Sequence, residues 1–209
     1  MTSFEYILII FPAISITVSI FYNFNKTPID NIFSVMLGYM LLTEIAAIVL
    51  VKFHILRYDY IIFNLYFLIL PLIMFMMFHK LTNSVKLKTR IRNLATILVL
   101  FFITDNIVLK NILFELQFHT YLLALLFLCY LTYVHLFEIL EAEKIKDYFR
   151  SKSALISIGI LIYSIPYMPI VIAFNAINII FEVRWILAFP LYTLMHFCFI
   201  IASIWTRHK

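Results

Sequence analysis

The residues with the clearest chemical potential are two carboxylic acids inside otherwise apolar stretches, Glu44 and Asp105. An acid in the hydrocarbon part of a membrane is costly, so it usually faces a neighbouring helix or a water-filled cavity. Glu44 lies eight residues before Lys52, and Asp105 lies five before Lys110. At 1.5 Å per helical residue, the acids lie roughly 12 and 8 Å below the same surface. Their similar depth predicts a shared polar site.

Four further polar side chains fall at overlapping depths in other apolar stretches. The helical rise places them roughly 6 to 18 Å from the ends of their segments. They are Asn64, Tyr167, Tyr192 and His196. Together with Glu44 and Asp105, which are predicted to form the charged floor of an outward-opening cavity, they make up the predicted ligand-binding set. In the alternative interpretation, each acid is hydrogen-bonded to a neighbouring helix and contacts no ligand.

Cysteine and histidine patterns do not indicate a cofactor. Cys129 and Cys198 lie inside apolar stretches without paired spacing, so neither a disulfide framework nor a CxxC site is predicted. His135 and His196 lie at different depths and lack an HxxxH spacing, which argues against a haem or metal pair. We expect no metal and no cofactor, a hydrogen-bonded His196 inside the bundle, and His135 at the membrane interface.

The elements that position these residues follow from composition. The chain has 209 residues, of which 65% are hydrophobic and 13% charged, whereas soluble domains average about 45–50% apolar and about 25% charged residues. This excludes a soluble globular protein. Seven apolar segments have membrane-spanning length. They are Phe4–Tyr22, Asn31–Val51, Tyr60–Phe78, Asn93–Leu109, Phe118–Phe137, Ser153–Phe174 and Val183–Thr206.

The fold class predicted from these segments is an all-α polytopic membrane helical bundle with seven transmembrane helices, forming one transmembrane domain over residues 1–209. A β-barrel would need alternating polar residues, and Leu68–Phe75 is apolar on every side. Asn93–Leu109 is the weakest segment, because it is short and contains Asp105. Pro166 and Pro169 interrupt the sixth segment, where we expect a hinge.

The distribution of lysine and arginine predicts the orientation. With the N-terminus outside and the C-terminus inside, twelve of the sixteen basic residues lie on the inner side and four on the outer side, as the positive-inside rule requires. We therefore expect a multi-pass protein of the bacterial inner membrane. The basic surface predicted on the cytoplasmic side consists of Lys86, Lys88, Arg90, Arg92, Lys144, Lys146 and Arg150.

The partners expected for this basic surface are anionic inner-leaflet lipids or a cytoplasmic protein. Direct nucleic-acid binding is not expected, because the basic residues alternate with apolar blocks instead of gathering on one folded face. The bilayer itself is the main partner of the apolar segments, and a homo-oligomer is a further expectation.

The last apolar segment lacks the lysine that a retinal protein requires. Val183–Thr206 contains no lysine for a retinal Schiff base. Three stretches resemble instead small seven-span membrane proteins of gliding and gut-type bacteria. They are Phe118-His119-Thr120-Tyr121, Ile158–Tyr163 and Leu191-Tyr192. This resemblance implies an accessory membrane component of signalling or defence modules and no defined activity.

Three functions follow as alternatives. An integral membrane sensor or accessory module, with an outward-facing polar cavity and a cytoplasmic partner, is favoured because catalytic motifs are lacking. The second is an oligomeric pore-forming or membrane-perturbing effector. The third is an intramembrane lipid-directed hydrolase that uses Glu44, Asp105 and His196 as acid and base groups. A non-enzymatic function is therefore preferred, with the catalytic residues unassigned.

Overall fold

The computed structural model describes residues 3–23, 27–52, 59–109, 117–142, 151–177 and 181–205. These residues form an all-α structure of seven helices. The helices are α1 (Ser3–Asn23), α2 (Pro28–Lys52), α3 (Asp59–Leu81), α4 (Val85–Leu109), α5 (Phe118–Ala142), α7 (Lys152–Ile177) and α8 (Phe181–Trp205). Each coincides with one predicted apolar segment, which confirms the predicted helical bundle.

Six of the helices are long and apolar enough to cross a membrane, and α1 contributes a shorter apolar stretch, Ile9–Tyr22. The chain is therefore a multi-pass membrane protein. The fourth span, Val85–Val108, is longer than predicted, because the helix begins eight residues before Asn93 and includes the basic residues. Long basic side chains are tolerated at a helix end, since their charged groups reach the interface. The large apolar side chains of Leu42 and Ile107 are exposed to lipid.

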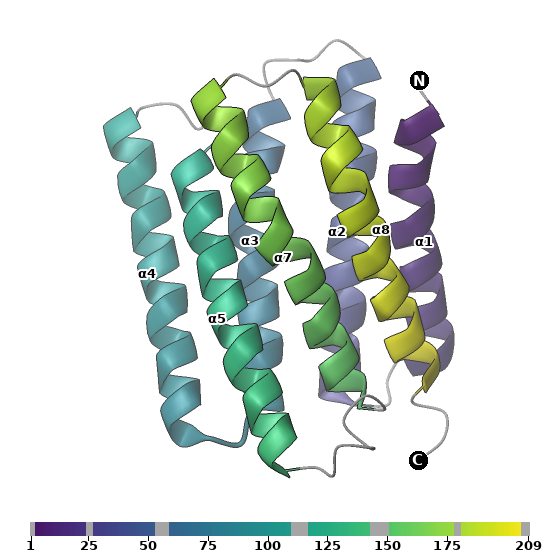
Figure 1. The fold of residues 1–209 in the computed structure, drawn as a ribbon, viewed down its shortest axis with the longest axis vertical. Helices are drawn as coiled ribbons and strands as arrows, with labels where there is room; N and C mark the ends of the chain where they lie inside the picture. Colours follow the sequence, from purple (N-terminus) through teal and green to yellow (C-terminus); the bar gives the residue numbers. More distant parts are fainter. Residues whose placement is uncertain are drawn as a thin grey trace.

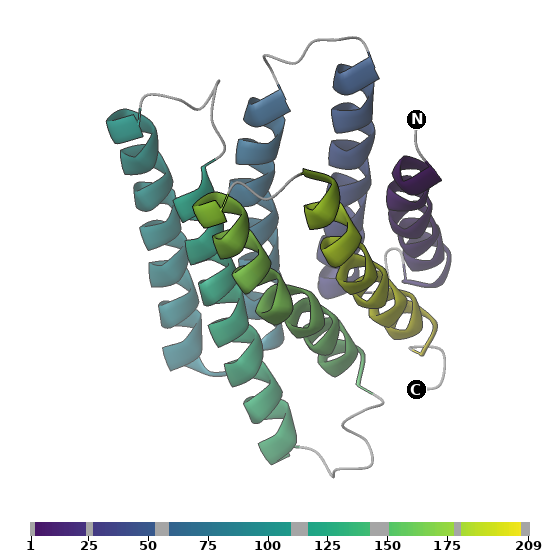
Figure 2. The ribbon, with the colours of Figure 1, turned by 45° about the horizontal axis from the view of Figure 1, so that its top comes forward.

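Six helices form a closed ring, and α4 lies outside it. Around the ring α1 packs on α2, α2 on α3, α3 on α5, α5 on α7, α7 on α8, and α8 back on α1. Helix α4 packs mainly against α3 and α5, at one edge of the bundle (Figures 1 and 2). Correspondingly, 17% of its span is buried, against 39–50% of the other five.

The start of α2 is fixed by a capping arrangement and an ion pair. The Thr27 hydroxyl accepts a hydrogen bond from the Asp30 backbone N–H at 3.1 Å and donates one to Asp30 Oδ2 at 2.7 Å. Pro28 occupies the first helical position, where its missing N–H is harmless. The Asp30 carboxylate also pairs with Lys152, at the start of α7. Two distant helices are thus joined at the end of the bundle where α1 ends, which we call the far end.

A glycine sets the distance between α7 and α8. A Cβ atom at Gly159 would lie 3.0 Å from the Cβ of Cys198 and 3.2 Å from the carbonyl oxygen of Met195. Only a residue without a side chain allows this approach, so Gly159 lets α8 bring Tyr192 against Tyr163 of α7.

Candidate functional site

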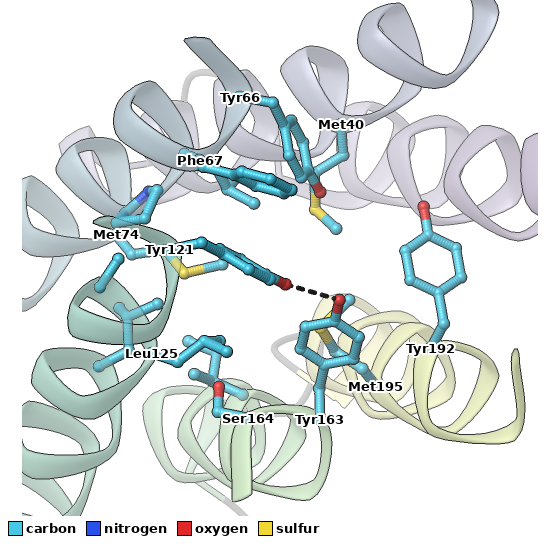
Figure 3. A pocket seen from close by; sticks show the side chains of 15 residues that line it. Met40, Tyr66, Phe67, Met74, Tyr121, Leu125, Tyr163, Ser164, Tyr192 and Met195 are labelled. Carbon is cyan, nitrogen blue, oxygen red and sulfur yellow. Dashed lines mark hydrogen bonds between the residues drawn. The ribbon is translucent and has the colours of Figure 1, made fainter. Parts of the chain in front are cut away.

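Five tyrosines from α3, α5, α7 and α8 meet inside the ring. This tyrosine cluster consists of Tyr66, Tyr121, Tyr163, Tyr167 and Tyr192. The hydroxyls of Tyr121 and Tyr163 share a hydrogen bond of 3.1 Å. The rings of Tyr163 and Tyr167 stack with centroids 4.9 Å apart, and Tyr192 lies edge-on to Tyr163 at 6.4 Å. Figure 3 shows the hydroxyls of Tyr66, Tyr121 and Tyr163 pointing toward one common space.

That common space is a small cavity. About 30 Å³ is open to the centres of water molecules, which is enough for one or two of them. Five helices supply the lining residues: Met40, Tyr66, Phe67, Leu70, Pro71, Met74, Tyr121, Ala124, Leu125, Leu128, Ile160, Tyr163, Ser164, Tyr192 and Met195. Methionine side chains are flexible and adapt their shape. The three methionines allow the cavity to adjust to a bound group.

Helical spacing explains how α7 presents two stacked tyrosines. Tyr163 and Tyr167 are four residues apart, so they lie on the same face of α7. Pro166 and Pro169 lie inside this helix, which nevertheless runs as one element from Lys152 to Ile177. The expected hinge is therefore not a break in the helix. The two prolines stand instead beside the tyrosine cluster.

Glu44 lies behind the cavity wall. It is half-buried and lies one helical turn from the lining residue Met40, on the same face of α2. Its carboxyl group interacts with the hydroxyl of Tyr192 and electrostatically with Tyr66. The contact with Tyr192 falls short of ideal hydrogen-bond geometry. Among the described residues, no basic side chain forms an ion pair with Glu44.

His196 is hydrogen-bonded inside the bundle, as predicted. Its Nδ1 lies 3.0 Å from the Ser15 hydroxyl oxygen, and both residues are fully buried. The Ser15 hydroxyl donates its proton to the Phe11 carbonyl at 2.8 Å, so Nδ1–H of His196 is the donor to Ser15. The ring of His196 packs edge-on against Tyr192 with centroids 4.5 Å apart. Its Nε2 atom has no hydrogen-bond partner among the described residues.

Asp105 and Asn64 lie away from the cavity and connect helices. Asp105 accepts a hydrogen bond from the Thr120 hydroxyl at 3.0 Å, which attaches α4 to α5. Asn64 accepts one from the backbone N–H of Gln117 at 2.8 Å, immediately before α5. Neither residue lines the cavity. Of the six predicted ligand-binding residues, the structure brings Tyr167 and Tyr192 into the cluster, and it places Glu44 and His196 beside Tyr192.

Three members of the cluster are missing from the set predicted by sequence. Tyr66 and Tyr121 carry no signal beyond a tyrosine in an apolar segment, which is typical of lipid-facing positions. Tyr163 lies three residues before Pro166, in the part of the segment where the sequence predicts a hinge and not a binding residue. The four-residue spacing of Tyr163 and Tyr167 is the one signal that could have revealed a shared face.

The sequence predicts His135 at the membrane interface, and its depth in the membrane stays a prediction. His135 of α5 is buried, and its ring lies edge-on to that of Phe78 of α3 at 5.5 Å. Because α3 packs on α5, the neighbouring helix covers the imidazole. Neither ring nitrogen has a hydrogen-bond partner among the described residues.

The predicted basic surface is only partly within the described residues. Lys86, Arg90 and Arg92 are exposed on α4, and Arg90 donates a hydrogen bond to the Tyr130 hydroxyl at 3.1 Å. The other members named on this surface are Lys88, which is half-buried, and three that lie outside the described residues, Lys144, Lys146 and Arg150.

In the part of the chain that the structure describes, no group of three or more His, Cys, Asp or Glu side chains could hold a metal ion.

Comparison with protein-family models, with curated proteins and with solved structures finds no match. Function is therefore inferred from the geometry of the tyrosine cluster.

Proposed function

We propose that the protein is an integral membrane sensor or accessory module whose ligand binds in the tyrosine cluster. The observation that carries this proposal is the convergence of three tyrosine hydroxyls, from α3, α5 and α7, on one cavity (Figure 3). Small-molecule sites are typically apolar pockets with a few convergent polar groups. A cavity walled by phenylalanine, leucine and methionine and edged by hydroxyls has this character.

The arrangement of the helices supports a coupling between this cavity and the far end of the bundle. A ligand larger than the cavity must displace one or more of the helices that line it, among them α3, α5 and α7. The same helices reach the far end, where Thr82, immediately after α3, donates a hydrogen bond to Glu138 of α5 at 2.8 Å. With the N-terminus outside, this end is cytoplasmic, and it carries the basic surface that a partner or anionic lipids would contact.

A thermal-shift experiment with a cavity-filling variant tests the proposal. Ala124 lies fully buried on the cavity wall, and Ala124→Val adds two methyl groups there. A panel of amines, carboxylic acids, neutral alcohols and lipids is added to the purified protein. We expect at least one class to raise the melting temperature of the wild type, because a ligand that binds only the folded state stabilises it. The shift should vanish in Ala124→Val.

The matched control is Ala46→Val, a half-buried alanine of α2 that does not line the cavity. It should retain the ligand-induced shift. A panel that raises the melting temperature of no variant, or raises it equally in Ala124→Val, would contradict a ligand site in the tyrosine cluster.

The two alternatives give different results in the same preparation. An oligomeric pore would release ions from loaded vesicles, and a lipid-directed hydrolase would convert phospholipid. A hydrolase that uses Glu44, Asp105 and His196 as acid and base groups has less support, because Asp105 accepts a hydrogen bond from Thr120 and lies away from the cavity.

A further inference from the structure

We infer that the ligand of the tyrosine cluster is a small primary ammonium cation, with Glu44 as its counter-charge; this inference rests on the proposed function. The argument combines the charge beside the cavity, the hydrogen-bonding groups that face it, its aromatic walls and its size.

The charge of the site comes from Glu44. A carboxylate in apolar surroundings is costly unless a positive charge lies nearby. The two acids that form ion pairs in the described part of the chain are Asp30, with Lys152, and Asp105, with His119. Glu44 has no basic partner of this kind, and it interacts with Tyr66 and Tyr192 on the cavity wall. A cation in the cavity would supply the missing charge, whereas an anion would be repelled.

The hydrogen-bonding groups favour an ammonium with N–H donors. Such a group carries three donors and no acceptor, as in lysine. The hydroxyl oxygens of Tyr66, Tyr121 and Tyr163 face the cavity as acceptors (Figure 3). The Tyr192 hydroxyl, buried at 6% exposure, has no well-formed hydrogen bond. It is placed to link a bound ammonium to the Glu44 carboxylate, since it lies between the cavity and that acid.

The walls of the cavity suit a cation with a short alkyl group. Tyrosine and phenylalanine ring faces attract cations within about 6 Å, and Phe67 stacks on Tyr121 with centroids 3.9 Å apart. Met40, Met74 and Met195 provide apolar surface for alkyl carbons. The open space of about 30 Å³ accepts a group the size of water, which an ammonium is. A trimethylammonium group is larger and has no N–H donor.

The test compares methylammonium with methanol, a neutral molecule of matched size, by isothermal titration calorimetry on the purified full chain in nanodiscs. We expect saturable binding of methylammonium and at least about tenfold weaker binding of methanol. Glu44→Gln removes the charge and keeps the shape. It should weaken methylammonium binding roughly 30-fold or more, as measured when one partner of a buried charge pair is truncated. Asp105→Asn, the matched control, should change it less than about twofold.

The outcomes separate this inference from the proposed function. Equal binding of methanol and methylammonium, or unchanged methylammonium binding in Glu44→Gln, overturns the cation inference and leaves the cavity as a ligand site. Absent methylammonium binding also overturns it; the site itself then stands only if another class of compound gives a shift that Ala124→Val abolishes. If Glu44→Gln does not fold, the comparison of the two probes on the wild type decides.

Discussion

Two regions of the same helical ring are packed in different ways. Toward the far end, phenylalanines fill the interior: Phe33, Phe75, Phe78 and Phe199 are at most 1% exposed, and Phe33 meets Phe199 edge-to-face at 5.5 Å. We call these four the phenylalanine core. In the tyrosine cluster, by contrast, hydroxyls point inward and leave a cavity.

The two kinds of packing suit different roles in the proposed function. Aromatic rings without polar atoms pack to high density, because every buried atom finds van der Waals contacts. Phenolic hydroxyls need hydrogen-bond partners and keep the rings of neighbouring helices apart. A site held by a rigid, apolar supporting region is the arrangement that precise binding requires. In the proposed function, the phenylalanine core is therefore the support and the tyrosine cluster the site.

The largest loss of stability is expected from a variant that disrupts an ion pair beside the phenylalanine core. Lys152→Met leaves the Asp30 carboxylate without its partner near the phenylalanine core, where Lys152 also lies 5.5 Å from the Phe33 ring. Removing one partner of a buried ion pair costs about 3–5 kcal/mol. Unfolding in mixed detergent micelles measures the loss. Lys86→Met, at an exposed position of α4, is the control. An equal, small effect of both variants would show that the ion pair does not support this region.

The next effect acts on the boundary between the two regions. Gly159→Ala places a Cβ 3.0 Å from that of Cys198 and 3.2 Å from the Met195 carbonyl, so α7 and α8 must separate. Overpacking of this kind costs about 1–3 kcal/mol. We expect a lower melting temperature together with weaker ligand binding, because Met195 also lines the cavity. Gly38→Ala meets only the end of the Ile16 side chain at 3.1 Å and should be milder; the reverse order would contradict the role assigned to Gly159.

The two regions also show which structural features could be predicted from the sequence. The seven helices were predicted because apolar length is a local signal that each segment carries by itself. Which face of each helix turns inward depends on its neighbours, so Tyr66 and Tyr121 could not be distinguished from lipid-facing aromatic residues. Glu44 and Tyr192 belong to the predicted ligand-binding set only because of their predicted depth in the membrane. Asp105 has a similar predicted depth, but α4 lies outside the ring. No property of the α4 sequence indicates this position.

A smaller effect on stability sharpens the assignment of the site. Tyr163→Phe removes the hydroxyl that is hydrogen-bonded to Tyr121 and faces the cavity. A typical hydrogen bond contributes about 1 kcal/mol to stability, so the fold should persist. Ligand binding should fall more than stability does. Tyr133→Phe, at a position of α5 that is 65% exposed, should change neither; equal effects of both variants on binding would remove the tyrosine cluster as the site.

The smallest effect is expected from the second intramembrane acid. Asp105→Asn keeps an oxygen that accepts the hydrogen bond from Thr120 and removes a charge that faces α5, not the cavity. Because α4 packs outside the ring, the melting temperature and ligand binding should stay near those of the wild type, with a stability change below about 0.5 kcal/mol. The same exchange at Glu44 should abolish most cation binding. If the two acids instead responded alike, depth in the membrane would matter more than position inside or outside the ring, and the distinction between the site and its surroundings would fail.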